Sequence, residues 1–195
     1  MNVAFTRAAE GYPRRAFSVE DIRRMIDAGV IREDERFELI EGEIVMMAAE
    51  RIAHDRIKNA LTVAFARAVP DGLFVGVKST LQLAENILVE PDLAIVARSV
   101  YHGDPKSFAR PRSEDVLLLV EIAVSSLTYD RDVKARLYAR HGIRELWVID
   151  ANERSAWVHT GPTGEGWSSV VARSGHETLT TPGLPGLAIR LDEVG

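Results

Sequence analysis

The segment at residues 116–124, VLLLVEIAV, constrains the fold of this chain more than any other. Its residues are nearly all apolar and many are branched, which is typical of a central strand covered on both faces of a sheet. A helix is predicted from Thr128 or Asp130 to about His141, where Gly142 ends it, and a second buried strand is predicted at residues 146–149. This order of strand, helix and strand predicts a crossover that leaves the two strands parallel. The predicted fold class is α/β.

Shorter patterns predict the other elements. Two amphipathic helices are expected at residues 18–28 and 50–69, because apolar residues recur there at spacings of three and four. Residues 36–47 are predicted to form a hairpin, and the strand-like runs at 73–77, 80–84 and 93–97 predict a meander. A long polar loop is expected at 99–115. The runs at 155–160, 167–172 and 187–191 predict a C-terminal hairpin and a last strand that extend the sheet.

The composition restricts the class of protein. With 195 residues, of which 46% are hydrophobic and 27% charged, the chain is expected to form one globular domain. No apolar run approaches the roughly 18 residues of a membrane span, and the start has no apolar export segment. We therefore expect a cytoplasmic protein with no membrane partner. The absence of cysteine excludes disulfides, thiolate nucleophiles and cysteine-bound zinc or iron.

Acidic residues outnumber basic ones by 29 to 24, which gives a net charge of -5 and no overall positive field to attract nucleic acid. A nucleic-acid partner would therefore need a local basic surface. The basic residues that could form one, or could equally be ordinary solvated charge, are Arg110, Arg112, Arg131, Lys134, Arg136 and Arg140.

The residues that point to chemistry are carboxylates on two predicted strands. Glu121 lies inside the apolar run, where an ionised carboxylate is costly unless it is paired or binds a cation. Asp92 stands just before the strand at 93–97. Two acids on neighbouring strands can bind Mg²⁺, a cation that takes oxygen ligands. Lys134, on the helix that follows, could reach back over the end of the Glu121 strand.

Each of these residues has a structural alternative. Asp92 could simply cap or turn the chain where the strand begins. Glu121 could form a buried ion pair with Lys134 or Arg136. Lys134 could instead pair with Asp130, four residues earlier on a solvated helix face.

Several motifs occur in a fixed order along the chain. They are FELIEGEIV at 37–45, a helix beginning with Ala53 and His54, VEPDLAIV at 89–96, VEIAVSS at 120–126, and then Asp130, Lys134, Tyr138 and Gly142 followed by RELWVID. Together they resemble the Uma-two family of restriction-endonuclease-like proteins, a bacterial branch of the PD-(D/E)XK nuclease superfamily. The resemblance predicts one domain over residues 1–195, with a core at about 17–158 and a C-terminal β extension at 159–195.

The resemblance implies a restriction-endonuclease-like core, in which helices flank a mixed central β-sheet. It also implies that Asp92 and Glu121 bind the metal ion and that Lys134 is the catalytic lysine. The superfamily usually places a lysine two or three residues after the second acid, where this sequence has Ala123 and Val124. The lysine on the helix is expected to take over that function.

Two further residues could belong to the site. Glu38 is similar to the family's first acidic motif and could be another ligand or orient water, although its place in a strand also fits an outward-facing acid. His54 could act near the metal, or could only cap or pack in the first turn of its helix.

Two functions from different classes remain open. The first is a Mg²⁺- or Mn²⁺-dependent endonuclease that hydrolyses phosphodiester bonds of DNA, because such a metal site can activate water and stabilise charge on a phosphoryl group. The second is a catalytically weak or inactive nuclease-fold module for binding or assembly, with its acids held in ion pairs. A homodimer is expected for the nuclease, because two symmetric sites can cut both strands of a duplex.

Overall fold

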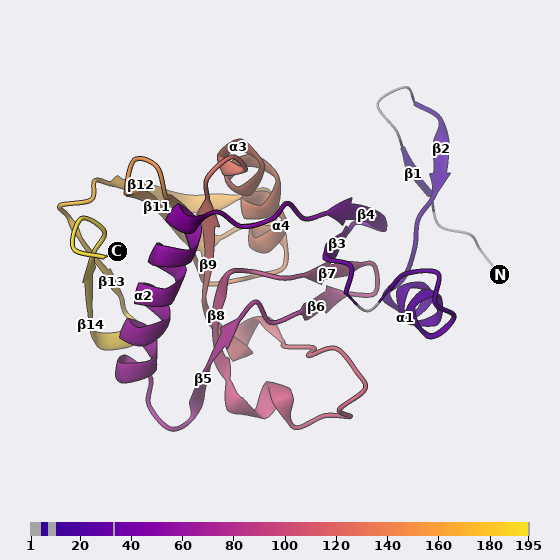
Figure 1. Cartoon of the computed structure of the whole chain (residues 1–195), viewed down its shortest axis with the longest axis horizontal. Helices are drawn as coiled ribbons and strands as arrows, with labels where there is room; N and C mark the ends of the chain where they lie inside the picture. Colours follow the sequence, from indigo (N-terminus) through magenta and orange to yellow (C-terminus); the bar gives the residue numbers. More distant parts are fainter. Residues whose placement is uncertain (1–4, 8–10, 33, 195) are drawn as a thin grey trace. The chain divides into compact units, whose positions relative to one another are not determined.

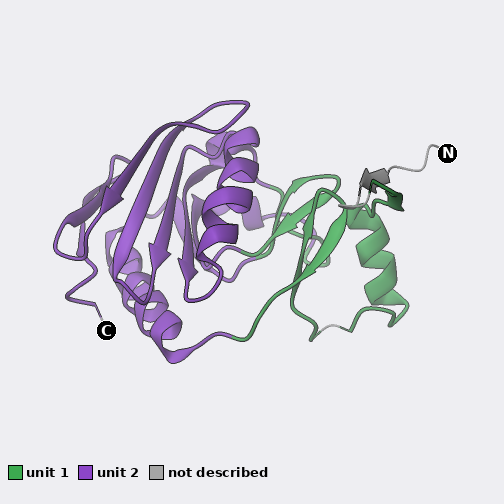
Figure 2. Ribbon diagram, turned by 90° about the horizontal axis from the view of Figure 1, so that it is seen from above, with its two compact units in different colours: residues 1–49, 80–90, 105–110 green, residues 50–79, 91–104, 111–195 purple. Residues whose placement is uncertain are grey.

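The computed structural model describes residues 5–7, 11–32 and 34–194, with backbone only for 5–7. The chain divides into two compact units, which Figure 2 distinguishes by colour. Unit 1 comprises residues 1–49, 80–90 and 105–110, and unit 2 comprises residues 50–79, 91–104 and 111–195. The prediction of a single domain stays a prediction.

Unit 1 contains the first predicted helix and hairpin. Helix α1 (Val19–Asp27) begins with a capping box in which Ser18 and Asp21 satisfy each other's backbone N–H groups. Strands β3 (Phe37–Ile40) and β4 (Glu43–Met46) form the predicted hairpin, and the turn between them places Gly42 at a φ of +89°. They belong to a four-stranded sheet in the order β4-β3-β7-β6, with β6 (Leu81–Ala84) and β7 (Ile87–Val89). The short strands β1 (Phe5–Arg7) and β2 (Pro13–Arg15) pair separately.

Unit 2 is built on a mixed six-stranded sheet in the order β12-β11-β10-β9-β8-β5 (Figure 1). The predicted central strand is β9 (Val116–Ala123), and it runs parallel to β10 (Glu145–Asp150) as the crossover pattern predicts. All other neighbours in this sheet are antiparallel. The remaining strands are β5 (Leu73–Val77), β8 (Leu93–Ala97), β11 (Ser155–Pro162) and β12 (Trp167–Arg173).

The crossover between β9 and β10 is helical but not uniform. It comprises α3 (Leu127–Tyr129), a π-helical turn (Asp130–Lys134) and α4 (Ala135–Arg140). In the π-helical turn the Ala135 N–H donates to the Asp130 carbonyl, five residues earlier. Gly142, at a φ of +71°, follows the last helical turn as predicted.

Helices cover both faces of the six-stranded sheet, and alternate residues of β9 face one helix layer or the other. Val120 and Ile122 share a hydrophobic core with Phe65 of α2 (Ile52–Ala68). Glu121, between them, instead meets Tyr138 of α4. Figure 2 shows helices on either side of this sheet in the purple unit. Glu121 therefore faces the crossover helices and its two neighbours face α2.

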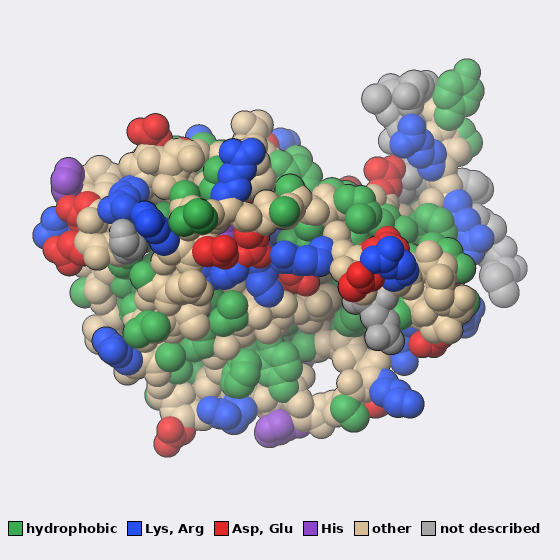
Figure 3. All heavy atoms as spheres, in the orientation of Figure 1, with side chains coloured by type: hydrophobic (Ala, Val, Ile, Leu, Met, Phe, Trp, Pro, Cys, Tyr) green, Lys and Arg blue, Asp and Glu red, His purple; other side chains and the backbone are tan. Residues whose placement is uncertain are grey.

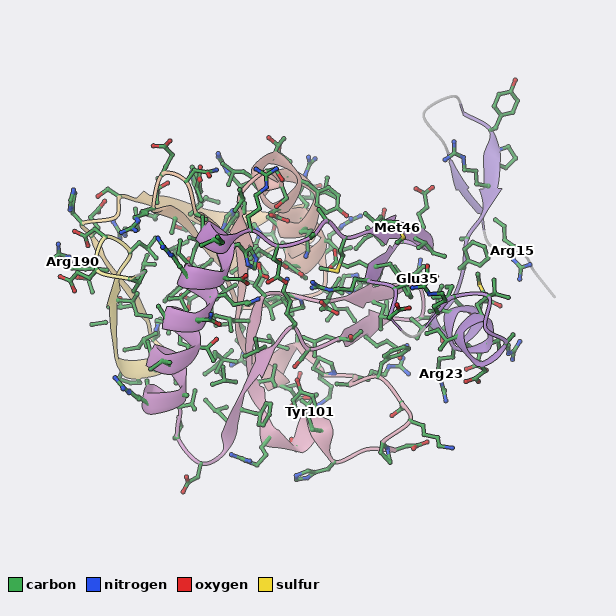
Figure 4. All side chains as sticks on the ribbon, in the orientation of Figure 1. Arg15, Arg23, Glu35, Met46, Tyr101 and Arg190 are labelled. Carbon is green, nitrogen blue, oxygen red and sulfur yellow. The ribbon has the colours of Figure 1, made fainter. Side chains whose placement is uncertain are left out.

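A small C-terminal hairpin completes unit 2. Strands β13 (Thr178–Thr181) and β14 (Leu184–Arg190) pair with each other, and β14 packs against α2. Arg190, labelled in Figure 4, pairs with Asp192 at 2.7 Å. Tyr101, also labelled, follows β8 in a short 3-10 helix (Arg98–Tyr101), and its ring lies 5.0 Å from that of Phe74. A second 3-10 turn (Ser113–Asp115) ends the predicted polar loop.

Two predictions about strand pairing are wrong. The runs at 73–77, 80–84 and 93–97 do not form a meander: β5 pairs directly with β8, whereas β6 pairs with β7 in the sheet of unit 1. The reason is the short strand β7, whose three residues turn the chain back on β6. The last strand does not extend the six-stranded sheet either, since β14 pairs with β13. The hairpin of β11 and β12 does extend it.

Candidate functional site

Three potential metal ligands meet in unit 2, at the start of α2 and of β8. Glu50 lies just before the N-cap of α2 and His54 lies in its first turn, with His54 Nδ1 3.3 Å from Glu50 Oε2. Asp92 precedes β8. One ligand atom from each of these three residues lies within 4.8 Å of the other two. Within the described part of the chain, these three residues form the one cluster of three or more potential ligands that could hold a metal ion. Glu121 is not part of it.

The two carboxylate oxygens of Asp92 have different partners: one accepts a backbone hydrogen bond and the other contacts two side chains. Its Oδ2 accepts the Ile122 N–H at 2.6 Å, which ties the carboxylate to β9. Its Oδ1 lies 2.8 Å from His54 Nε2 and also contacts the Lys78 ammonium. Oδ1 is therefore buried between an imidazole nitrogen and an ammonium group. The side chain is only 5% exposed, and such an acceptor suits a cation.

His54 lies between the two acids of this group. Its Nδ1 is 3.3 Å from Glu50 Oε2, while its Nε2 faces Asp92. Among the described residues, no aligned hydrogen bond reaches the buried Nδ1. A buried nitrogen without such a partner, beside two acids, favours a binding position at this cluster.

Two lysines form ion pairs with the acids of this cluster. Lys78 contacts both Asp92 Oδ1 and Glu50 Oε1, the latter at 3.1 Å. Lys58 contacts Glu50 Oε2 and lies 3.0 Å from Asp55 Oδ1. Lys78 has a φ of +50°, a left-handed conformation that costs a non-glycine residue about 1–3 kcal/mol. Its position beside the acids is therefore maintained against backbone strain.

The electrostatics of the cluster keep its acids ionised. Burial by itself would raise the pKa of Asp92, but His54 and the positive charge of Lys78 outweigh it, and the pKa lies below its ordinary value. Burial likewise opposes ionisation of Glu50, and the contacts with Lys58 and Lys78 hold its pKa well below the usual range. Both residues therefore present negative oxygens at neutral pH, as cation ligands must.

A second group of polar side chains lies on the crossover side of the sheet. Lys134 Nζ is 2.7 Å from Glu121 Oε1, and the Tyr138 hydroxyl donates to the same oxygen at 2.5 Å. Lys134 ends the π-helical turn, and the indole N–H of Trp167 donates to the next carbonyl, Ala135 O, at 2.8 Å. The predicted reach of Lys134 to the Glu121 strand is thus confirmed. The solvated-face alternative for Lys134 is wrong, since its side chain is 4% exposed.

The two groups meet across one strand pair. In the antiparallel register Leu93 faces Val120, so Asp92 and Glu121 occupy the next facing positions. The hydrogen bond from Ile122 N–H to Asp92 agrees with this register. The prediction that the two acids stand on neighbouring strands is confirmed. Their roles in catalysis and metal binding stay predictions, because Glu121 has the ion pair that was its structural alternative.

Glu38 lies in the other unit. It is 3% exposed in β3, and its Oε1 accepts the Glu90 N–H at 2.8 Å. The outward-facing alternative is therefore wrong, because the carboxylate is buried and bonded. A catalytic role for Glu38 stays a prediction.

The predicted basic surface is partly engaged in local contacts. Arg131 lies over the Trp157 ring, 4.0 Å from its centroid, and Arg112 pairs with Asp115 at 3.1 Å. On the face drawn in Figure 3, described acidic and basic side chains are interspersed. A DNA-binding surface formed by these arginines stays a prediction.

Four residues of these groups did not emerge as candidates from the sequence: Glu50, Lys58, Lys78 and Tyr138. Glu50 could have been found from its position four residues before His54, and Tyr138 from its position four residues after Lys134. Lys78 carries no such signal, because the loop after β5 brings it to the cluster.

Comparisons with known proteins agree with this architecture. The fold matches the crystal structure of a putative nuclease belonging to DUF820 from Anabaena variabilis ATCC 29413, with a TM-score of 0.70 and 14% identity over 91% of this chain and 96% of that one. No curated protein matches the chain. Among the described residues, no helix is long and apolar enough to cross a membrane. The Uma2 (Uma-two) family, described as putative restriction endonuclease, matches residues 19–192, and the chain therefore belongs to this family.

Proposed function

We propose that the protein is a metal-dependent endonuclease that hydrolyses phosphodiester bonds of DNA. Family membership supports a nuclease, and the cluster around Asp92 supports a metal requirement. The observation that carries the proposal is the convergence of Glu50, His54 and Asp92: one ligand atom from each lies within 4.8 Å of the other two, and the Asp92 side chain is 5% exposed.

The donor set fits a divalent cation. Glu50 and Asp92 would supply carboxylate oxygens, the ligands of Mg²⁺ and Mn²⁺, and His54 would supply an imidazole nitrogen. Imidazole is a better ligand for Mn²⁺ than for Mg²⁺, so with His54 bound we expect Mn²⁺ to bind more tightly. Glu121 remains a proposed ligand on the facing strand. A bound ion would lower the pKa of a coordinated water and offset the charge that develops on the phosphoryl oxygens.

The residues of the second group would act on the substrate side. Lys134 holds a positive charge on a flexible stem, and such a charge stabilises a phosphate in the transition state. The Tyr138 hydroxyl donates a hydrogen bond to Glu121 and so fixes this carboxylate beside the lysine. Asp92 is oriented by the backbone of β9, which leaves Oδ1 on the side of Glu50 and His54.

A cytoplasmic location and a homodimer form part of the proposal. Two symmetric sites would allow both strands of a duplex to be cut, and two-fold pairs are the commonest oligomers. Strand β12 forms one edge of the six-stranded sheet and carries the exposed Val170 and Val171, so it is a suitable surface for such a contact.

One observation favours the second function, a binding or assembly module without efficient catalysis. The side chains of Glu121 and Lys134 are at most 5% exposed and neutralise each other. A phosphate could reach this lysine only if the pair opened. If the pair stays closed, the nuclease fold would serve binding alone.

Nicking of supercoiled plasmid separates the two functions. The wild type should nick DNA with Mg²⁺ or Mn²⁺ and not with EDTA, while Glu121→Gln and Asp92→Asn should lose at least 100-fold in rate, as removal of one electrostatic catalytic group commonly does. Asp150→Asn is the matched control, because Asp150 is a buried acid at the end of β10 that binds the Asn152 and Glu153 N–H groups. Equal nicking by all four proteins would indicate a contaminant, and no nicking by any would favour the binding module.

A further inference from the structure

We propose that the Lys78 ammonium is a built-in counter-cation of the acidic cluster, and that a divalent metal ion displaces it on binding. The inference rests on the metal site of the proposed function. It adds that the cluster is already neutralised when it holds no metal, and that metal binding is an exchange of one cation for another.

The contacts of Lys78 coincide with the oxygens of the candidate site. Its amine touches Asp92 Oδ1 and lies 3.1 Å from Glu50 Oε1. These two residues supply both carboxylates of the three-residue group. Lysine and metal would therefore compete for the same negative charge, and an ammonium that touches both acids opposes a second cation there.

The ammonium is bound to the cluster by charge. It forms ion pairs with Asp92 Oδ1 and with Glu50 Oε1. A divalent ion carries twice the charge and can bind the same oxygens directly. The exchange therefore replaces an ion pair by a coordination bond.

The side chain of Lys78 is partly open to solvent, which would let its amine move away from the acids. It is 19% exposed, more than Glu50 at 15% or Asp92 at 5%, so the amine can move toward solvent. Its backbone is anchored separately, because the Lys78 N–H donates to the Asp92 carbonyl at 3.1 Å. The flexible stem can therefore swing while the left-handed turn and β8 stay in place.

Lys58 is placed differently. Its ion pairs among the described residues are with the other oxygen of Glu50 and with Asp55, and not with Asp92. It can keep these partners while Glu50 Oε1 and Asp92 Oδ1 bind a metal ion. The exchange thus concerns Lys78 specifically.

Calorimetric titration with Ca²⁺, which takes oxygen ligands, tests this exchange on the full chain. Lys78→Met should bind Ca²⁺ about tenfold more tightly than the wild type, the effect of removing one competing charged contact. Lys78→Arg, which keeps the charge, should bind no more tightly than the wild type. Lys106→Met removes an exposed lysine of the loop before β9 and should leave the affinity unchanged.

Thermal melting supplies a second readout. In EDTA, Lys78→Met should melt below the wild type because Glu50 and Asp92 then repel each other, and saturating Ca²⁺ should close this gap. If Lys78→Met does not fold, Lys78→Gln replaces it, since glutamine lacks the charge but can still donate a hydrogen bond.

The outcomes separate this inference from the proposed function. If the wild type binds Ca²⁺ and Lys78→Met binds it equally or more weakly, the counter-cation is refuted and the metal site stands. If neither the wild type nor any Lys78 variant binds Ca²⁺, Mg²⁺ or Mn²⁺, both the inference and the metal-dependent nuclease are refuted.

Discussion

Lys134 Nζ lies 2.7 Å from Glu121 Oε1, and both side chains are closed from solvent on the crossover side of the central sheet. A pair of this kind explains how an acid can occupy the most apolar strand of the chain. Breaking it from one side leaves an uncompensated buried charge, which is far more costly than removing both partners.

Lys134→Met should therefore lower the free energy of unfolding by about 3 kcal/mol, the usual cost of leaving the buried carboxylate of an ion pair without its cation. The double variant Glu121→Gln with Lys134→Met should recover part of this loss. Urea denaturation of the wild type, both single variants and the double variant measures the coupling. Strictly additive losses would show that the two side chains do not interact in solution.

The Tyr138 hydroxyl should also matter to this pair. Tyr138→Phe conserves the buried ring and removes only the donor to Glu121 Oε1. Because hydrogen bonds to charged groups contribute about 1.5–3 kcal/mol, we expect a loss of about 2 kcal/mol in stability. The same substitution in a Glu121→Gln background should cost less. An equal cost in both backgrounds would show that the hydroxyl does not act through the charge of Glu121.

Acid should destabilise the metal-free protein through Asp92. Its pKa is lowered in the folded state, so its contribution to stability is present above its unfolded pKa, near 4, and is lost as the pH falls through the folded value. Asp92→Asn removes this contribution. Urea midpoints between pH 7 and pH 3 in EDTA should fall more steeply for the wild type than for the variant. Parallel curves would contradict the assignment.

Glu145 should show the opposite dependence. Burial raises its pKa, although Thr181 and Trp147 each donate a hydrogen bond to it at 2.7 Å. A raised folded pKa means that stability is fully present below the unfolded pKa and is lost as the pH rises through the folded value. Glu145→Gln should therefore be more stable than the wild type at pH 8, and this advantage should vanish by pH 4. A variant that is less stable at pH 8 would show that the ionised form is needed there.

The parts of the fold that the sequence predicts are those in which a local pattern decides the structure. The apolar and branched run at 116–124 predicts a covered strand, and Gly142 ends the helix that follows it. The parallel pairing of β9 and β10 follows from that order, because a crossover returns the chain to the same sheet. Ser18 and Asp21 similarly mark the start of α1 within three residues of sequence.

The parts that it does not predict depend on pairing at a distance. Three residues, Ile87 to Val89, are too few for a strong strand pattern, yet they move β6 into the other sheet. The candidate site shows the same limit. Asp92 and Glu121 are recognisable from their strands, whereas Lys78 reaches Asp92 only through the left-handed turn after β5. No spacing along the chain encodes that approach.

The most direct measurement is an anomalous difference map from crystals of the wild type soaked in Mn²⁺. The account predicts a peak coordinated by Glu50, His54 and Asp92, and no peak at this position in Asp92→Asn crystals treated in the same way. If only water lies between these three residues at saturating Mn²⁺, or if the peak is held by side chains other than these three and Glu121, the account is contradicted.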